Sequence, residues 1–361
     1  MKKININLKE QQKSYSIYLG TNLIEKIAKL YDLTNISKIF VITDDTVAKI
    51  FLQELLANLP KETQSIILPT GENEKNIENA QKIWMAMYKA KLDRKSLVIN
   101  LGGGVIGDIG GFTASTFMRG IPFINIPTTL LSQVDESVGG KTGINFAGIK
   151  NLIGTFTQPK AVIIDTAALK TLPKREFIAG FGEIIKHGLI TDKKYFEKVT
   201  SKNPLKFSDE ELVEIITGSC QIKKAIVQND EMEKGKRKLL NFGHTIGHAI
   251  EALSLETDKP LLHGEAISIG IIAEAKLSEQ VGLLSKEERI LIENKVTTAG
   301  MVTRIQIDNP NGIFEKMKLD KKNTKGKINF TLLKKIGEAI QDHQVTTENI
   351  LEAIKYIIIK Q

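Results

Sequence analysis

The chain has 361 residues, enough for about two domains of ordinary size, and its composition (42% hydrophobic, 25% charged) excludes wholesale disorder. Its net charge of +8 comes from lysines spread along the sequence, without the concentrated basic arm expected of a nucleic-acid-binding protein. The single cysteine, Cys220, excludes an intrachain disulfide and a cysteine-built metal site.

The N-terminus has no apolar signal-peptide core, and no apolar run approaches the roughly 20 residues that span a bilayer. We therefore expect a cytoplasmic protein with no nucleic-acid or membrane partner. The diffuse positive charge favours an anionic small molecule as partner, although a merely lysine-rich composition explains it equally well.

From residue 1 to about residue 167, short β-branched runs alternate with stretches of helical pattern. We predict strands at 38–43, 65–68, 96–101, 123–126 and 161–164, and helices at 47–58 and 76–92. This alternation is typical of a parallel sheet covered by helices, so we predict a Rossmann-like, nucleotide-binding α/β domain over residues 1–168. Ligands of such sheets bind at the carboxyl ends of the strands.

Glycines and acidic residues follow several of these strands. The segment Gly102–Asp108 (GGGVIGD) contains G-x-G-x-x-G, whose glycines let backbone N–H groups approach a pyrophosphate. It departs from the usual dinucleotide fingerprint, because it follows a third strand and lacks an acid about 20 residues further on. Asp44 ends an earlier strand and suits an adenosine ribose, and the segment 71–75 (GENEK) offers a carboxylate and an ammonium. Each loop alone reads equally as a tight turn, but three at one sheet edge favour a nucleotide site.

The segment Gly139–Thr142 (GGKT) looks like the end of a phosphate-binding P-loop. We reject this interpretation, because position 135 is Asp where the motif requires Gly, and no strand directly precedes the segment. Lys141 and Lys150 remain as cations for an anionic substrate.

After residue 172 helical periodicity dominates. We predict helices near 176–190, 209–229, 243–256, 264–281 and 286–299, and an all-α, metal-binding C-terminal domain over residues 169–361. His244 and His248, four residues apart, lie on one helical face, which suits a divalent metal, although two unrelated surface histidines have the same spacing.

Two further stretches carry candidate ligands. Glu183, Lys186 and His187 share a helical face among apolar neighbours, which indicates that the glutamate is at least partly buried. His263 precedes a strongly apolar helix. Three nitrogen and oxygen ligands suit a catalytic Zn²⁺ with open positions.

These motifs, in this order, resemble those of the 3-dehydroquinate synthases, and the resemblance covers nearly the whole chain. The stretches that carry it are 71–75, 102–108, 127–135, 139–143, 150–154, 169–173, 241–249 and 263–266. The resemblance implies a nucleotide-binding α/β domain, a helical C-terminal domain with the active site in the cleft between them, and a homodimer. It also implies tightly held NAD and a divalent metal, zinc or cobalt.

The reaction implied by the resemblance converts 3-deoxy-D-arabino-heptulosonate 7-phosphate to 3-dehydroquinate and phosphate in the shikimate pathway. The substrate is transiently oxidised by NAD, loses phosphate, is reduced again and closes its ring in an aldol step, without net redox change. Our hypothesis is that Lys141, His248 and the departing phosphate share the proton transfers.

The resemblance further assigns residues to the site. The metal ligands of the family correspond to Glu183, His244 and His263, whereas His248 faces the substrate. The cofactor contacts correspond to Asp44, Gly71, Glu72, Lys75, Gly104, Val105, Ile106, Gly107, Asp108, Thr128, Thr129, Lys141, Lys150, Leu169, Lys170 and Thr171. The catalytic and substrate contacts correspond to Asp135, Lys141, Lys150, Asn151, Lys186, Lys224, Arg237, Asn241 and His248. Arg119 would reach the phosphate of the substrate bound to the neighbouring subunit, and Lys321 or Lys322 would be a further phosphate contact.

Two classes of alternative stay open at this point. Relatives on the same scaffold are sugar phosphate cyclases that form other rings, or metal- and NAD-dependent polyol dehydrogenases, which accumulate NADH. A non-catalytic NAD- or metal-sensing regulator is the other class, and it would tolerate the loss of Lys141 or Asp135.

Overall fold

The chain folds into two compact units. The computed structural model describes residues 1–8, 14–307, 310–318 and 328–359. The first unit consists of residues 1–172 and 212–228, and the second of residues 173–211 and 229–361. The sequence pattern predicted one break, between residues 168 and 169, and did not predict that a later segment joins the first unit.

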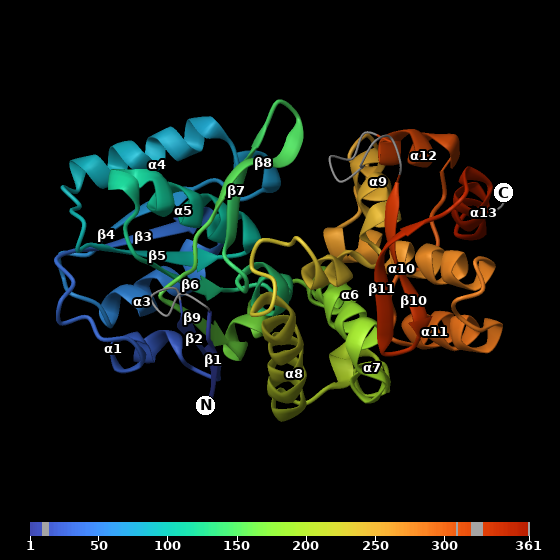
Figure 1. Ribbon diagram of the computed structural model, residues 1–361. Helices are drawn as coiled ribbons and strands as arrows, with labels where there is room; N and C mark the ends of the chain where they lie inside the picture. Colours follow the sequence, from blue (N-terminus) through green and yellow to red (C-terminus); the bar gives the residue numbers. More distant parts are fainter. Residues whose placement is uncertain (9–13, 308–309, 319–327, 360–361) are drawn as a thin grey trace. The chain divides into compact units, whose positions relative to one another are not determined.

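The described part of the first unit is built on a seven-stranded sheet (Figure 1) with the order β1-β2-β9-β6-β5-β3-β4. Neighbouring strands are parallel except β1 and β2, which are antiparallel. The five predicted strands are all present, and β1 and β2 were not predicted. The strands are β1 (Lys2–Ile6), β2 (Tyr15–Gly20), β3 (Ile39–Asp44), β4 (Gln64–Leu68), β5 (Leu97–Gly102), β6 (Phe123–Pro127) and β9 (Ala161–Asp165).

Both faces of this sheet are covered by helices (Figure 1), which confirms the Rossmann-like α/β prediction. Alternate residues of a strand point to opposite faces, so Val41 packs in the core on one side and Phe40 in the core on the other. The Val41 side is covered by α1 (Ile27–Leu30) and by a helix that runs through α2 (Asp45–Val47), a π-helical turn and α3 (Gln53–Ala57). The Phe40 side is covered by α4 (Ile77–Lys89) and α5 (Gly104–Thr116).

An antiparallel hairpin, β7 (Lys141–Phe146) and β8 (Ile149–Phe156), also belongs to the first unit and was not predicted. It turns at Ala147 and Gly148, which both have positive φ. The hairpin contacts α5 through both of its strands and α4 through β7.

The helix α8 (Asp209–Val227) joins the first unit over residues 212–228 because its buried face binds that unit. The Lys223 ammonium donates to the Asp135 carboxylate at 2.5 Å, and the Cys220 thiol lies 3.5 Å from the Gln133 carbonyl oxygen. Local periodicity shows which face of α8 is buried but not which unit that face contacts, so the sequence pattern assigned the helix to the C-terminal domain.

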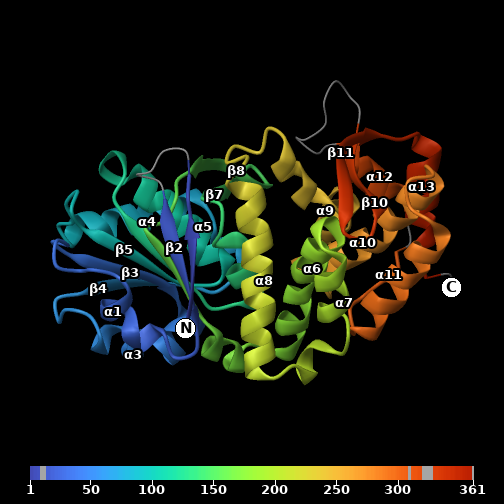
Figure 2. The ribbon, with the colours of Figure 1, turned by 60° about the horizontal axis from the view of Figure 1, so that its bottom comes forward.

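The second unit is mainly helical (Figure 1, Figure 2). Its helices are α6 (Lys174–Thr191), α7 (Lys193–Val199), α9 (His244–Ser254), α10 (His263–Gln280), α11 (Lys286–Thr298), α12 (Pro310–Lys318) and α13 (Thr347–Tyr356). It also contains an antiparallel hairpin of β10 (Asn329–Lys335) and β11 (Glu338–Gln344), for which the sequence pattern predicted no strand. None of the helices in the described residues has both the length and the apolar character needed to cross a membrane.

The helix α10 is the core of this unit and contacts α6, α9, α11, α13 and β10. Two of its glycines allow neighbouring backbones to come very close. A Cβ atom on Gly264 would lie 1.8 Å from the Ala179 carbonyl oxygen of α6, and one on Gly270 would lie 2.0 Å from the Gly243 carbonyl oxygen. Because any side chain there would push the helices apart, these glycines fix how α6 and α9 approach α10.

Candidate active site

The second unit brings a glutamate and two histidines together from three helices. Glu183 lies in the middle of α6 and is fully buried, whereas His244 begins α9 and His263 begins α10. The Nε2 atoms of His244 and His263 lie 3.3 Å and 3.6 Å from the same oxygen, Glu183 Oε1. Neither Glu183 oxygen accepts a hydrogen bond of ordinary geometry within the described residues, although Oε2 forms an ion pair with Lys186.

His248 completes a cluster of three imidazoles. One ring nitrogen of each of His244, His248 and His263 lies within 4.8 Å of the others. The ring centroids of His244 and His248 are 5.0 Å apart, which confirms that the four-residue spacing places both on one face of α9. Three imidazoles and one carboxylate are therefore available here as donors to a metal.

The electrostatics of this cluster favour an ionised glutamate. Burial by itself raises the pKa of Glu183, but the Lys186 ammonium and His244 hold it well below its ordinary value. Burial and the positive charge of Lys186 lower the pKa of His244 to about 4. Burial acts in the same direction on His263, but Glu183 and Glu251 outweigh it and raise the pKa of His263 to about 10.

The backbone before α9 determines where His244 points. Gly243 is the N-cap residue and has a φ of +79°, a conformation that favours glycine. The buried carboxylate of Glu274 on α10 accepts hydrogen bonds from the N–H groups of Gly243 and Ile246. This carboxylate satisfies donors that the first turn of a helix otherwise leaves unpaired, and no sequence motif pointed to it.

Other predicted residues of the second unit lie in polar networks. Lys186 is 1% exposed, and Arg237, 3% exposed, donates from Nη1 to the Glu231 carbonyl oxygen at 2.6 Å. The Asn241 amide donates to Glu233 Oε1 at 3.1 Å. The two lysines predicted as alternative phosphate contacts, Lys321 and Lys322, lie outside the described residues.

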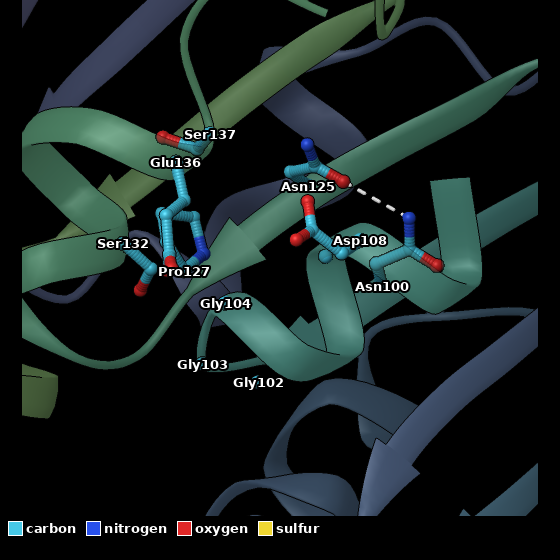
Figure 3. Close-up of a pocket in the computed structure, with 11 residues that line it drawn as sticks. Asn100, Gly102, Gly103, Gly104, Asp108, Asn125, Pro127, Ser132, Glu136 and Ser137 are labelled. Carbon is cyan, nitrogen blue, oxygen red and sulfur yellow. Dashed lines mark hydrogen bonds between the residues drawn. The ribbon is translucent and has the colours of Figure 1, made fainter. Parts of the chain in front are cut away.

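In the first unit, the glycine-rich segment forms the predicted turn from a strand into a helix. Gly102 ends β5, Gly103 is the N-cap residue of α5, and residues 104–108 form the first turns of that helix. A pocket opens at this point (Figure 3), lined by Gly102, Gly104, Asp108, Asn125, Glu136 and Ser137 among others. Free N–H groups at a helix N-terminus bind anions such as a pyrophosphate.

Glu136 was not predicted to belong to this pocket. A Cβ atom on Gly104 would lie 1.7 Å from Oε2 of Glu136, so the carboxylate occupies the space where a side chain at position 104 would lie. Figure 3 shows the Glu136 side chain extending toward this end of α5. A negative charge therefore lies beside the expected pyrophosphate position.

Lys75 links the segment 71–75 to the same pocket. Its ammonium is buried and lies 3.1 Å from Asp108 Oδ2 and 3.2 Å from Glu72 Oε1. Burial lowers the pKa of Lys75, but these carboxylates and Glu136 outweigh it and raise the pKa above its ordinary value. Burial raises the pKa of Asp108, which the Lys75 charge only partly offsets. Gly71, which opens the segment, has a φ of +133°.

Asp44 and Thr128 lie at the same edge of the sheet. The Asp44 carboxylate accepts hydrogen bonds from the N–H groups of Thr46 and Val47, so it caps the following helix. The N–H group of Thr128 donates to the Gly102 carbonyl oxygen at 3.0 Å, which holds Thr128 and Thr129 beside the glycine-rich turn. The remaining expected cofactor contacts, Leu169, Lys170 and Thr171, lie in a short 3-10 helix (Thr166–Thr171).

The hairpin and α8 carry the remaining predicted residues of the first unit. Lys141 is exposed at the start of β7, and Lys150 and Asn151 are exposed at the start of β8. The Asn151 N–H group donates to the Asn145 side chain, which itself donates to Glu72 Oε1 at 2.9 Å. The hairpin is therefore tied to the segment 71–75. Arg119 is exposed after α5 with a φ of +70°.

Asp135 is paired with a lysine that the sequence motifs did not single out. Lys223, 4% exposed, donates to Asp135, whereas its predicted neighbour Lys224 is half-buried. The helical spacing could have indicated that Lys223 is buried, because it falls on the apolar face of α8 with Cys220 and Val227.

Comparisons with known proteins agree over the length of the chain. Two family models match, 3-dehydroquinate synthase N-terminal over residues 65–179 and 3-dehydroquinate synthase C-terminal over residues 180–323. The chain is 44% identical to the 3-dehydroquinate synthase of Thermoanaerobacter pseudethanolicus, covering 98% of this chain and 99% of that protein. It is 42% identical to that of Campylobacter concisus, again covering 98% and 99%.

A solved structure extends this similarity to three dimensions. The 2-epi-5-epi-valiolone synthase of Streptomyces hygroscopicus, with NAD⁺ and Zn²⁺ bound, superposes with a TM-score of 0.85 at 26% identity. The superposition covers 95% of this chain and 96% of that one.

Proposed function

The chain belongs to the 3-dehydroquinate synthase family, and we propose that it converts 3-deoxy-D-arabino-heptulosonate 7-phosphate to 3-dehydroquinate and phosphate with bound NAD and a divalent metal. The observation that carries this proposal is the buried Glu183 carboxylate, which faces the Nε2 atoms of two histidines from two other helices. The glycine-rich turn at the carboxyl edge of a parallel sheet supports the cofactor.

The donor set of the second unit fits a divalent metal. Glu183, His244 and His263 supply one oxygen and two nitrogen ligands, which suit Zn²⁺ or Co²⁺ and leave positions for a substrate. The low pKa of Glu183 supports this assignment, because a carboxylate must be ionised to bind a metal. We assign His248 to the substrate rather than to the metal, following the resemblance.

The first unit fits NAD at the glycine-rich turn. The N–H groups from Gly104 onward suit the pyrophosphate, Asp44 suits a ribose, and Lys75 contributes a cation. The carboxylate of Glu136 acts against the cofactor, because it places a negative charge beside the pyrophosphate position. When bound, NAD supplies a hydride acceptor that later returns the hydride, and the metal supplies a charge that polarises the hydroxyl being oxidised.

The polar residues of both units suit a substrate that carries a carboxylate and a phosphate. In the second unit, Lys186 and Arg237 are buried cations that orient anionic groups, and the planar guanidinium suits a carboxylate. In the first unit, the exposed ammonium groups of Lys141 and Lys150 suit a phosphate. We propose that the His248 imidazole and the Lys141 ammonium exchange protons with the substrate hydroxyls and the leaving phosphate.

We further propose a homodimer and a cytoplasmic location. The hairpin supports the dimer, because its large apolar side chains Phe146, Ile149, Leu152, Ile153 and Phe156 are each 36% to 49% exposed. In a dimer, Arg119 would reach the phosphate bound to the partner subunit. Light scattering on the purified protein tests this, because a monomer at micromolar concentration would contradict it.

Identification of the product tests the proposed function. The purified protein is incubated with the heptulosonate phosphate, NAD and Zn²⁺, and the carbocyclic product is identified by NMR. We expect 3-dehydroquinate, and we expect a chelator to abolish its formation until Zn²⁺ or Co²⁺ is restored. A different carbocycle would indicate a related cyclase, and turnover that survives complete metal removal would contradict the metal assignment.

A further inference from the structure

Glu251 is a buried acidic residue that is not among the proposed metal ligands, cofactor contacts or substrate contacts. It lies on α9, seven residues after His244, and its side chain is 10% exposed. Its Oε2 atom lies 3.0 Å from Nδ1 of His263, the first residue of α10. Because buried carboxylates need compensating partners, this contact accounts for part of the cost of burying Glu251.

The contact determines which nitrogen of His263 is available. An imidazole that donates from Nδ1 to a carboxylate keeps the lone pair of Nε2. In the structure this Nε2 atom faces Glu183 Oε1 at 3.6 Å. When a metal takes the place of the Nε2 proton, the Glu251 contact would therefore hold the ring so that the lone pair of Nε2 points to the place where the proposed metal would bind.

His244 has the same arrangement with a different acceptor. Its Nδ1 atom lies 3.1 Å from the carbonyl oxygen of Phe242, and its Nε2 atom lies 3.3 Å from Glu183 Oε1. Both histidines thus expose Nε2 to one carboxylate oxygen because Nδ1 is held on the other side. The difference is one of charge, since Phe242 offers a neutral carbonyl and Glu251 a full negative charge.

We propose that Glu251 is the positioning residue of the proposed metal ligand His263: its carboxylate holds Nδ1 and orients the ring so that Nε2 faces the place where a metal would bind. This inference rests on the proposed metal site, and concerns a residue outside the ligand set. Carboxylates behind ligating histidines commonly change metal affinity by about 10- to 100-fold. A purely structural role, joining the end of α9 to the start of α10, is the competing explanation.

Metal titration of the apoprotein separates these roles without requiring turnover. Glu251→Gln keeps the shape and an oxygen that accepts from Nδ1, but removes the charge. We expect its Kd for Co²⁺, measured by competition with a chromophoric chelator, to rise about 10- to 100-fold, with an unchanged melting curve of the metal-free protein. Glu256→Gln is the matched control, because it removes the same charge from an exposed site just beyond α9, and its Kd should equal that of the wild type.

Glu251→Asp keeps the charge on a shorter side chain, so it is expected to bind Co²⁺ more tightly than Glu251→Gln. It also serves as the second variant if Glu251→Gln melts at a lower temperature. Equal Kd values for wild type and Glu251→Gln, or equal losses in Glu251→Gln and Glu256→Gln, would overturn the positioning role while leaving the metal site intact. A wild-type apoprotein that binds no Co²⁺ or Zn²⁺ would instead refute the metal site, and this inference with it.

Discussion

The carboxylate of Glu274 is predicted to hold the N-terminus of α9, and thereby His244, in place. Glu274 is fully buried on α10. Its Oε2 atom accepts from the Gly243 N–H group at 2.6 Å, and its Oε1 atom accepts from the Ile246 N–H group at 3.0 Å. Glu274→Gln replaces one acceptor oxygen by an NH₂ group, so a donor would face a backbone donor.

The size of the effect follows from these two contacts. A hydrogen bond to a charged group contributes about 1.5–3 kcal/mol, and a buried donor left unpaired costs about 1–3 kcal/mol. The lost hydrogen bond and the unpaired N–H group are partly the same effect, so the two energies are not added in full. Glu274→Gln should therefore lower the free energy of unfolding by about 2–4 kcal/mol. We also expect a weaker affinity for metal, since Gly243 precedes His244 and sets its direction.

Urea-induced unfolding, followed by far-UV circular dichroism, measures the change in stability. Glu287→Gln, which removes an exposed carboxylate from α11, is the control and should remain within about 0.5 kcal/mol of the wild type. A change of less than about 0.5 kcal/mol in Glu274→Gln would refute the assigned role, because it would mean that the two N–H groups do not depend on this carboxylate.

Two further predictions concern the first unit. Glu136→Gln removes a negative charge beside Gly104, so calorimetry should show NAD binding about 2- to 30-fold tighter than in the wild type, the range expected for one charge at a helix N-terminus. The control Glu62→Gln, on an exposed turn, should leave the affinity for NAD unchanged. Equal affinity for NAD in the two variants would contradict the reasoning. Burial raises the pKa of the Cys220 thiol to about 12, so iodoacetamide at pH 8 should modify the native protein more than about 100-fold more slowly than the urea-unfolded chain, as mass spectrometry would show. Rapid labelling of the native protein would show that α8 does not bury this thiol.

The central strands of the sheet could be predicted because they are buried on both faces. Each of β3, β5, β6 and β9 is buried along its whole length and consists mostly of apolar residues, and that pattern does not depend on the partner strand. The hairpins β7–β8 and β10–β11 each include a strand, β8 or β11, whose residues are mostly exposed or half-buried, so they lack that pattern. The sequence pattern likewise predicted that α8 is a helix, but not that it belongs to the first unit, because that assignment depends on its contacts with distant residues.

Only those features of the candidate site that depend on residue type and on spacing along the chain could be predicted. The apolar neighbours of Glu183 indicated its burial, and the structure confirms that it is fully buried. Glu251 and Glu274 were missed because their roles depend on the approach of α9 to α10, which no spacing within one helix contains. The division of His244 and His248 between metal and substrate stays a prediction.

The most direct test of the central claim follows phosphate and NADH in the same reaction. With the heptulosonate phosphate as substrate and a stoichiometric amount of NAD, we predict many turnovers of released phosphate with no accumulation of NADH, because the hydride returns to the substrate. One NADH formed for each substrate consumed, or NADH formation without phosphate release, would contradict the account and identify a dehydrogenase on this scaffold.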